Sequence, residues 1–264
     1  MKFRVASDLH LEFRSSYLDD VLFLPDLQDD KETCLILAGD IGLLYDPRTY
    51  AKFMKHSSEQ FKNIFWIGGN HEWYHSNIDK INIKMAIDDL ALSNIYTERL
   101  VLEEERIFII GYTLWTNFDN EDQDSMLIAQ RYMSDFHIIE TSNDIDSKTS
   151  ILKPRETLVF HREQLESIFY GVDHYSKLGY KCIVVSHHQP SLNGIQKEFQ
   201  GDRMNGAFAS DLDEKIKKHN IEYWIAGHTH SMQKYMIGNT KVITNPLGYP
   251  SEDTGFDPTL TFEL

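Results

Sequence analysis

Residues 64–72 read Ile-Phe-Trp-Ile-Gly-Gly-Asn-His-Glu, an apolar run that passes directly into an amide, an imidazole and a carboxylate. The run Ile64–Ile67 consists of β-branched and aromatic residues, which predicts a buried strand. In α/β folds, the residue just past the end of such a strand points into the crevice where ligands bind. The motif Gly69–Glu72 is therefore predicted to lie at one edge of a sheet.

Four more motifs follow apolar runs in the same way. If all of them share one crevice, imidazoles and carboxylates gather in a small volume, which is costly unless a cation occupies it. The motifs are Asp8-Leu9-His10 after Phe3–Ala6, Gly39-Asp40 after Leu35–Ala38, His187-His188 after Cys182–Val185, and Gly227-His228-Thr229-His230 after Tyr223–Ala226.

Carboxylate, imidazole and amide groups offer oxygen and nitrogen ligands but no thiolate. This mixture suits Mn²⁺, Fe²⁺ or Zn²⁺ better than Ca²⁺, and octahedral geometry would favour Mn²⁺ or Fe²⁺. One carboxylate can bridge two ions about 3.5–4 Å apart, the spacing used in two-metal hydrolysis. The motifs therefore favour a site for two divalent metal ions, with Mn²⁺ as the preferred ion.

The composition is that of an ordinary globular protein, with 264 residues, of which 41% are hydrophobic and 25% charged. We find no repeat and no low-complexity linker, which predicts a single domain over residues 1–264, with an irregular, substrate-shaping region at about 113–153. The net charge of −15 counts against binding to long nucleic acid, which requires clustered Lys and Arg.

No run approaches the roughly 20 apolar residues that span a bilayer, and the chain shows no secretory signal. Cys34 and Cys182 lie in apolar runs and are predicted to be buried free thiols. We therefore expect a soluble, cytoplasmic protein without a membrane partner. The sequence leaves the oligomeric state open.

Hydrophobic spacing and turn signals predict the remaining elements. Strands and helices alternate early and strands dominate the end, which suggests two mixed sheets facing each other with helices outside. We expect helices over Pro47–Phe61, 77–92, 124–135, 153–170 with a continuation toward Leu178, and 210–219; a loop over 141–150; and strands over Asn63–Ile67, Arg99–Leu102, 106–112, Lys181–Ser186, Gln233–Ile237, 241–244 and 259–263.

The five motifs, in this order, resemble the signature of the calcineurin-like metallophosphoesterases, which runs D-x-H, G-D, G-N-H-[D/E], H and G-H-x-H. The resemblance extends from residue 8 to residue 230 and implies the α/β metallo-dependent phosphatase fold, a four-layer αββα sandwich of two mixed sheets flanked by helices. The wider stretches 7–12 and 245–249 are similar to those of uncharacterised bacterial and phage members.

Departures from the family pattern show which subfamilies of phosphoesterases this chain resembles less. His10 is followed by Leu11, and Asp40 by Ile41, so the motifs of the phosphoprotein phosphatases are incomplete. Leu43 stands where purple acid phosphatases need tyrosine. Glu72, in place of aspartate, makes the chain a less typical match to the bacterial cyclic-nucleotide phosphodiesterases.

The resemblance also implies roles for single residues. His71 would protonate the leaving oxygen and would not bind metal, and Glu72 could orient it, as a neighbouring carboxylate commonly does for imidazole. The implied ligands are Asp8, His10, Asp40 and His230 for one ion, and Asp40, Asn70, His187 and His228 for the other, with Asp40 as the bridge.

The implied reaction is metal-dependent hydrolysis of a small phosphomonoester or phosphodiester, by a hydroxide that bridges the two ions. One alternative is a nuclease, a nucleotide pyrophosphatase or a cyclic-nucleotide phosphodiesterase. Another is a catalytically silent metal-binding scaffold, but such relatives typically lose the catalytic histidine or several ligands. This chain keeps His71 and all the ligand residues.

Further residues are weaker candidates for substrate contact, because Arg makes bidentate contacts to phosphate and long loops beside a site often hold substrate. A structural or solvated role is the alternative for each, and Trp115 could line the crevice or pack in the core. Six other histidines are predicted to lie at the surface: His56, His75, His137, His161, His174 and His219. The substrate candidates are His188, Arg131, Arg203 and Asn205.

Overall fold

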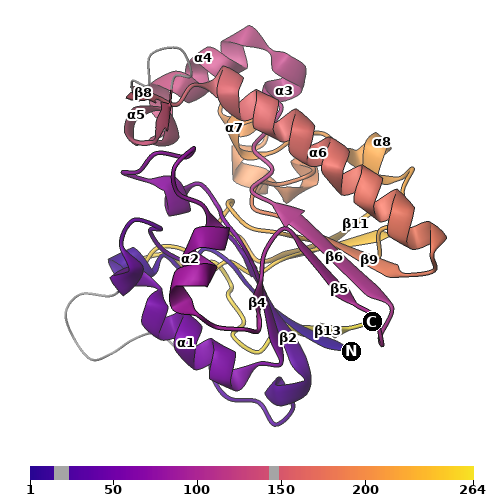
Figure 1. The fold of residues 1–264 in the computed structure, drawn as a ribbon. Helices are drawn as coiled ribbons and strands as arrows, with labels where there is room; N and C mark the ends of the chain where they lie inside the picture. Colours follow the sequence, from indigo (N-terminus) through magenta and orange to yellow (C-terminus); the bar gives the residue numbers. More distant parts are fainter. Residues whose placement is uncertain (15–23, 143–148) are drawn as a thin grey trace.

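The structure, a computed structural model, describes residues 1–14, 24–142 and 149–264. Two β-sheets lie face to face in it, with α1 and α2 beside one sheet and α6 along the other (Figure 1).

The first sheet is mixed, because four parallel strands are joined by one antiparallel edge strand. Ala6 pairs with Leu37, and Ala38 pairs with Ile67, so the carboxyl ends of the first three strands meet at one edge. The strands, in spatial order, are β13 (Thr261–Glu263), β1 (Lys2–Ala6), β2 (Thr33–Ala38), β3 (Asn63–Ile67) and β4 (Ile95–Tyr96).

The second sheet is also mixed, with a parallel centre and an antiparallel strand at each edge. Its strands, in spatial order, are β11 (Gln233–Ile237), β12 (Thr240–Thr244), β10 (Tyr223–Ala226), β9 (Lys181–Ser186), β6 (Ile107–Tyr112) and β5 (Arg99–Leu102).

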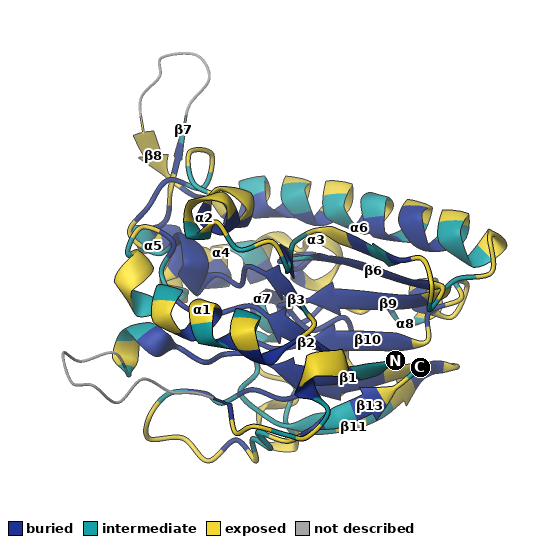
Figure 2. Cartoon of the chain, turned by 60° about the horizontal axis from the view of Figure 1, so that its bottom comes forward, coloured by how far each residue is buried: buried dark blue, intermediate teal, exposed yellow. Residues whose placement is uncertain are grey.

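The central strands are apolar on both faces, since successive side chains point in opposite directions. Ile36 of β2 packs between the sheets, whereas Leu37 packs toward α1 and α2. In β9, Val185 packs between the sheets and Val184 packs toward α6 and α8. The layers therefore run helix, sheet, sheet, helix, with buried strands inside and helices outside (Figure 2), which confirms the predicted sandwich.

The helices are mostly short, apart from one long helix on the second sheet. They are α1 (Ala51–Gln60), α2 (Ile83–Leu90), α3 (Phe118–Glu121), α4 (Gln123–Tyr132), α5 (Asp135–Ile138), α6 (Pro154–Lys177), α7 (Asn205–Phe208) and α8 (Asp213–Ile216). Short 3-10 turns cover Leu11–Phe13, Asp30–Glu32, Pro47–Thr49, His71–Trp73, Leu192–Gly194 and Lys197–Phe199.

Several predicted boundaries were wrong. The helix expected from residue 77 begins only at Ile83, because Asn82 caps it by accepting the N–H of Met85 at 3.0 Å. The helices expected over 47–61 and 210–219 are shorter, and the first is preceded by a 3-10 turn. A loop was expected over 141–150, but its two ends belong to a pair of antiparallel strands, β7 (Glu140–Ser142) and β8 (Thr149–Ile151). Residues 143–148 lie outside the described residues.

In the described part of the chain, none of the helices is both long enough and apolar enough to cross a membrane. Cys34 and Cys182 are free and buried, as predicted.

Candidate metal centre

The five motifs follow β1, β2, β3, β9 and β10, and the chain turns sharply after most of these strands. A positive φ in a residue other than glycine costs about 1–2 kcal/mol, and such strain concentrates at functional sites. The residues with this conformation, at φ angles from 45° to 70°, include Asp8, His10, Asp40, His228 and His230.

Two motif glycines allow these loops to approach one another. A Cβ atom on Gly69 would lie 2.1 Å from Oδ1 of Asp40, and one on Gly39 would lie 2.5 Å from Nδ1 of His187. Gly39 also has a φ of +88°. Any larger residue at these positions would therefore push the site side chains apart.

One group of candidate ligands joins the first and last motifs. Nε2 of His230 lies 3.4 Å from Oδ1 of Asp8 and 3.1 Å from Nε2 of His10. One ligand atom from each of the three residues lies within 4.8 Å of the others, so together they could hold a metal ion.

A second group joins the other motifs. Nε2 of His187 lies 3.3 Å from Oδ2 of Asp40 and 3.1 Å from Oδ1 of Asn70. His228 belongs to the same group, and its Nε2 atom is buried without a hydrogen-bond partner among the described residues. A buried polar atom without a partner is costly, so this nitrogen fits a metal ligand.

Asp40 lies between the two groups. Its Oδ1 atom accepts a hydrogen bond of 2.9 Å from the N–H of His71. Its Oδ2 atom lies 3.8 Å from Nε2 of His10 in one group and 3.3 Å from Nε2 of His187 in the other. A single carboxylate oxygen thus faces both candidate sites.

The electrostatics of the centre favour positive charge. Burial opposes ionisation of Asp40, but the imidazoles of His187 and His71 outweigh it and hold the pKa of Asp40 well below its ordinary value. Although burial opposes a charged ring, Asp40 and Asp8 raise the pKa of His187 to about 10. Burial likewise opposes charge on His230, but Asp8 raises its pKa to about 9. The carboxylates therefore draw cations into this volume.

His228 is held in the opposite state. Burial, followed by the neighbouring rings of His188 and His187, holds the pKa of His228 well below its ordinary value. A neutral imidazole is the form that binds metal.

Outer partners orient the candidate ligands. Nδ1 of His187 donates to the carbonyl oxygen of Ala38 at 2.9 Å, and Nδ1 of His230 donates to Oε2 of Glu252 at 2.6 Å. Such bonds fix the imidazole tautomer that presents Nε2 to a metal.

Asn70 is oriented by the partly buried Tyr74 and the buried Asp135. Its Nδ2 atom donates to the hydroxyl of Tyr74 at 3.0 Å, and its side chain also bonds the carboxylate of Asp135. Burial raises the pKa of Asp135 to about 6, although the bond to Asn70 opposes this shift. The Oδ1 atom of Asn70 lies on the other side, 3.1 Å from Nε2 of His187.

His71 lies beside Asp40 but is held by other residues. Its Nδ1 atom lies 2.9 Å from Oε1 of Glu12, and its Nε2 atom lies 3.2 Å from the hydroxyl of Tyr249. Burial opposes protonation, but the charges of Asp40 and Glu12 outweigh it and raise the pKa of His71 above its ordinary value.

The role expected for Glu72 was wrong. Its fully buried carboxylate accepts the backbone N–H groups of Asp40 at 2.9 Å, Ile41 at 2.8 Å and Gly69 at 2.7 Å. Burial and the charge of Asp40 raise its pKa to about 8, while these donors stabilise the ionised form. Glu72 therefore ties two motif loops together, and the carboxylate beside His71 is that of Glu12.

No motif in the sequence predicted a role for Glu12, Asp135, Tyr249 or Glu252. The sequence offered a way to find two of them, Glu12 and Tyr249, because each is the last residue of a stretch that resembles other family members. Asp135 and Glu252 lie among many acidic residues outside any motif, so the sequence offered no means of selecting them.

His188 lies behind the centre. It is buried, its Nδ1 atom lies 3.3 Å from the carbonyl oxygen of Thr113, and its ring contacts those of Trp115 and His228 at centroid distances of 5.2 and 4.2 Å. This position supports the ring of His228. Trp115 is itself buried, so it packs in the core beside the site.

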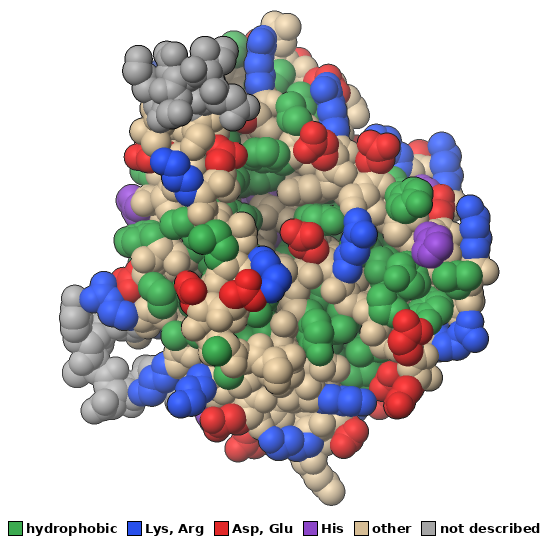
Figure 3. Space-filling view, in the orientation of Figure 1, with side chains coloured by type: hydrophobic (Ala, Val, Ile, Leu, Met, Phe, Trp, Pro, Cys, Tyr) green, Lys and Arg blue, Asp and Glu red, His purple; other side chains and the backbone are tan. Residues whose placement is uncertain are grey.

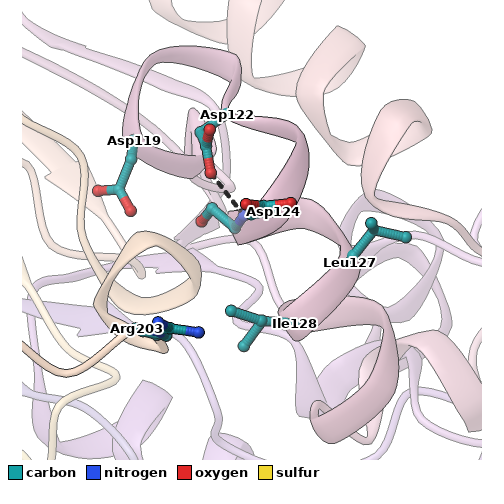
Figure 4. Close-up of a pocket in the computed structure, with 7 residues that line it drawn as sticks. Asp119, Asp122, Asp124, Leu127, Ile128 and Arg203 are labelled. Atoms are coloured by element: carbon teal, nitrogen blue, oxygen red, sulfur yellow. Dashed lines mark hydrogen bonds between the residues drawn. The ribbon is translucent and has the colours of Figure 1, made fainter.

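The structure does not bring the two candidate arginines into the metal groups. The guanidinium of Arg131 lies over the ring of Tyr132 on the exposed face of α4. Arg203 lines a separate cleft of about 480 Å³ and points toward Ile128, with Asp119, Asp122 and Asp124 above it (Figure 4).

Asn205 begins α7, and its side chain donates to the carbonyl oxygen of Phe199 at 2.8 Å. At the other end of the same helix, the ring of Phe208 stacks on His228 at a centroid distance of 4.8 Å. The carboxyl end of this helix therefore packs against the metal centre, whereas Asn205 does not reach it.

One of the histidines predicted to lie at the surface, His161, is buried. His161 is buried within α6, where its Nδ1 atom contacts the carbonyl oxygen of Trp115. Burial lowers its pKa to about 4.

On the face drawn in Figure 3, acidic and basic side chains are intermingled, without a continuous basic stripe.

Two facing mixed sheets between helices, with clustered acids and imidazoles at their carboxyl edges, define the metallo-dependent phosphatase fold. The calcineurin-like phosphoesterase family model matches residues 1–232, so this chain belongs to that family. It is accordingly a metal-binding hydrolase that acts on phosphoesters.

Other known proteins are similar to this chain in sequence or in fold. An uncharacterised protein of Acanthamoeba polyphaga mimivirus is 29% identical over 273 residues, which cover 97% of this chain and 94% of the relative. Phosphopantetheinyl hydrolase from Mycobacterium tuberculosis has a similar fold, with a TM-score of 0.61 and 15% identity over 94% of this chain and 90% of that chain. A dimetal phosphatase from Danio rerio is similar with a TM-score of 0.53 and 12% identity over 96% and 89%.

Proposed function

We propose that this protein hydrolyses a phosphomonoester or phosphodiester of a small molecule, using two divalent metal ions that share Asp40. The observation that carries the proposal is the position of Oδ2 of Asp40, 3.8 Å from Nε2 of His10 and 3.3 Å from Nε2 of His187. One ion would be held by Asp8, His10, Asp40 and His230, and the other by Asp40, Asn70, His187 and His228.

The side chains fit these ions on two counts. The donor set is oxygen and nitrogen without thiolate, which suits Mn²⁺, Fe²⁺ or Zn²⁺, and we favour Mn²⁺. The Nε2 atom of His228, which has no hydrogen-bond partner in the described part of the chain, gains one if a metal binds there. Such ions, when bound, polarise a phosphate group and lower the pKa of a coordinated water.

His71 acts as the general acid in this proposal. Its Nδ1 atom faces the carboxylate of Glu12, so Nε2 is the nitrogen that faces the open side of the site, beside the hydroxyl of Tyr249. A proton given from Nε2 to the departing alkoxide would contribute about 10²–10⁴-fold to the rate.

A small substrate fits the charge of the protein better than a long nucleic acid. The net charge of −15 repels a polyanion, whereas two cations in the centre can still attract a single phosphate group. The free, buried state of Cys34 and Cys182 supports a reducing, cytoplasmic location.

The test is a panel of phosphomonoesters, phosphodiesters, nucleotides and short oligonucleotides, assayed with Mn²⁺, Fe²⁺, Zn²⁺ and Ni²⁺ in turn. We expect hydrolysis of small esters that disappears with a chelator and returns with metal, most strongly with Mn²⁺. Salt-sensitive cleavage of oligonucleotides alone would favour a nuclease. Metal binding without hydrolysis of any substrate would favour a scaffold and overturn the proposal.

A further inference from the structure

Glu12 lies between a candidate metal ligand and the candidate general acid. Its Oε1 atom lies 3.2 Å from Nδ1 of His10 and 2.9 Å from Nδ1 of His71. The side chain of Glu12 is only 6% exposed, and those of His10 and His71 are 0% and 7% exposed. Because an ionised carboxylate only accepts hydrogen bonds, both imidazoles must donate from Nδ1.

The local backbone places the carboxylate between the two rings. His10 has a φ of 45°, and the chain then enters the 3-10 turn Leu11–Phe13. This reversal brings Glu12 back over His10, where it meets His71 from another strand end, 59 positions away in sequence. Its second oxygen, Oε2, is buried and has no hydrogen-bond partner among the described residues, so Oε1 alone serves both rings.

The opposite side of His71 is also defined. One face of the ring stacks on Tyr74 at a centroid distance of 4.1 Å, and Nε2 lies 3.2 Å from the hydroxyl of Tyr249. With Nδ1 donating to Glu12, the neutral ring accepts the Tyr249 O–H at Nε2, whereas the protonated ring, which is the form that can give a proton to a leaving oxygen, donates from Nε2 to the same hydroxyl oxygen. A hydroxyl oxygen therefore already stands where a leaving oxygen could meet this nitrogen.

We propose that Glu12 is a positioning residue that holds His71, and with it His10, in the tautomer whose Nε2 atom faces the reacting centre. This inference rests on the proposed function, in which His71 is the general acid. Glu12 acts through the two imidazoles and does not touch the phosphate. Loss of Glu12 therefore disturbs proton donation by His71 and also loosens a ligand of one metal ion.

The experiment compares E12A and E12Q with the wild-type protein, at saturating Mn²⁺, on an alkyl phosphoester and on a nitrophenyl ester. A nitrophenolate leaves without help from an acid, whereas an alkoxide needs a proton. For E12A we expect kcat to fall about 10²-fold or more on the alkyl ester and far less on the nitrophenyl ester. E12Q should recover most of this loss, because its amide oxygen can replace Oε1 while its NH₂ group takes the partnerless position of Oε2.

Two measurements separate positioning from general damage. Nitrogen-15 NMR of the metal-free protein, at a pH high enough for the ring of His71 to be neutral, should show the Nδ1–H tautomer in the wild type and a mixture in E12A. In the H71A background, E12A should slow hydrolysis of the alkyl ester by the same factor as hydrolysis of the nitrophenyl ester. The effect of Glu12 on proton donation acts through His71, so it disappears once His71 is removed.

Glu252 offers a matched control. Its carboxylate accepts a hydrogen bond from Nδ1 of His230, as the carboxylate of Glu12 does from Nδ1 of His10. Among the described residues, His71 is not one of its hydrogen-bond partners. E252A should weaken metal binding, measured by titration and elemental analysis, without changing the ratio of alkyl to nitrophenyl rates.

Equal losses on both esters in E12A, or an unchanged His71 tautomer, would overturn the positioning role. If the wild-type protein hydrolyses no ester with any metal, the proposed function fails instead. The NMR result then still decides whether Glu12 sets the tautomer of His71.

Discussion

Nδ1 of His187, which follows a strand of the second sheet, donates a hydrogen bond of 2.9 Å to the carbonyl oxygen of Ala38, the last residue of a strand in the first sheet. This bond joins the two sheets at their carboxyl edges. It also turns Nε2 of His187 toward Asp40 and Asn70. The packing of the sandwich and the geometry of the metal centre therefore depend on the same contact.

Replacing Asp40 with asparagine should reduce the metal content of the protein. An amide carries no charge and bridges two cations poorly, so we expect fewer than two ions per chain after dialysis and loss of ester hydrolysis. Elemental analysis of the purified protein measures this directly. D88N is the control, because Asp88 is exposed on α2 and pairs with Lys84. A D40N protein that retained two ions would refute the bridging assignment.

Replacing His71 with alanine should affect substrates unequally. Loss of the general acid should slow hydrolysis of alkyl phosphoesters by about 10²–10⁴-fold, while nitrophenyl esters lose far less. Steady-state kinetics on the two substrates, at equal metal occupancy, provide the comparison. The assignment fails if both rates fall by the same factor.

Replacing Glu72 with alanine should destabilise the fold. The carboxylate accepts three backbone N–H groups in a fully buried position, and each donor left without a partner costs about 1–3 kcal/mol. We expect the free energy of unfolding in urea to fall by about 3 kcal/mol or more in metal-free protein. E72Q keeps one acceptor oxygen and should lose less. An E72A protein as stable as the wild type would contradict this role.

His161 should make stability depend on pH. Burial lowers its folded-state pKa to about 4, below the ordinary value of 6.5. Between these two pH values the unfolded chain binds a proton at His161 that the folded chain does not bind. Protonation therefore favours the unfolded chain, and the free energy of unfolding decreases as pH falls from about 6.5 to about 4. We expect H161Q to flatten the dependence of the unfolding free energy on pH in this window. Parallel pH profiles for both proteins would argue against a buried neutral His161.

A substitution at Gly39 should be poorly tolerated. An added Cβ would lie 2.5 Å from Nδ1 of His187 and 2.6 Å from the backbone nitrogen of Gly69, and the φ of +88° is unfavourable for other residues. We expect G39A to lower both thermal stability and metal content. G201A is a suitable control, since Gly201 has a similar φ of +86° but open space around its α-carbon. Comparable losses in the two variants would show that strain, and not crowding, is the cause.

Local patterns predicted the strands well, because most are buried on both faces and read as continuous apolar runs. Asn63–Ile67, Lys181–Ser186 and Tyr223–Ala226 begin and end where the sequence predicted. The helix at Ile83–Leu90 was placed too early because Ile78 and Ile81 continue its apolar spacing, although both lie in the turn before Asn82. Apolar spacing alone does not reveal where a capping side chain starts the helix.

The sequence by itself determined which chemical groups reach the centre, because each motif directly follows its strand and parallel strands end at a common edge. It could not determine which carboxylate serves which imidazole. Glu72 adjoins His71 in sequence but bonds backbone N–H groups, whereas Glu12 and Tyr249, 59 and 178 positions away, contact the ring. Those pairings depend on how the loops of the two sheets meet, and only the tertiary structure decides that.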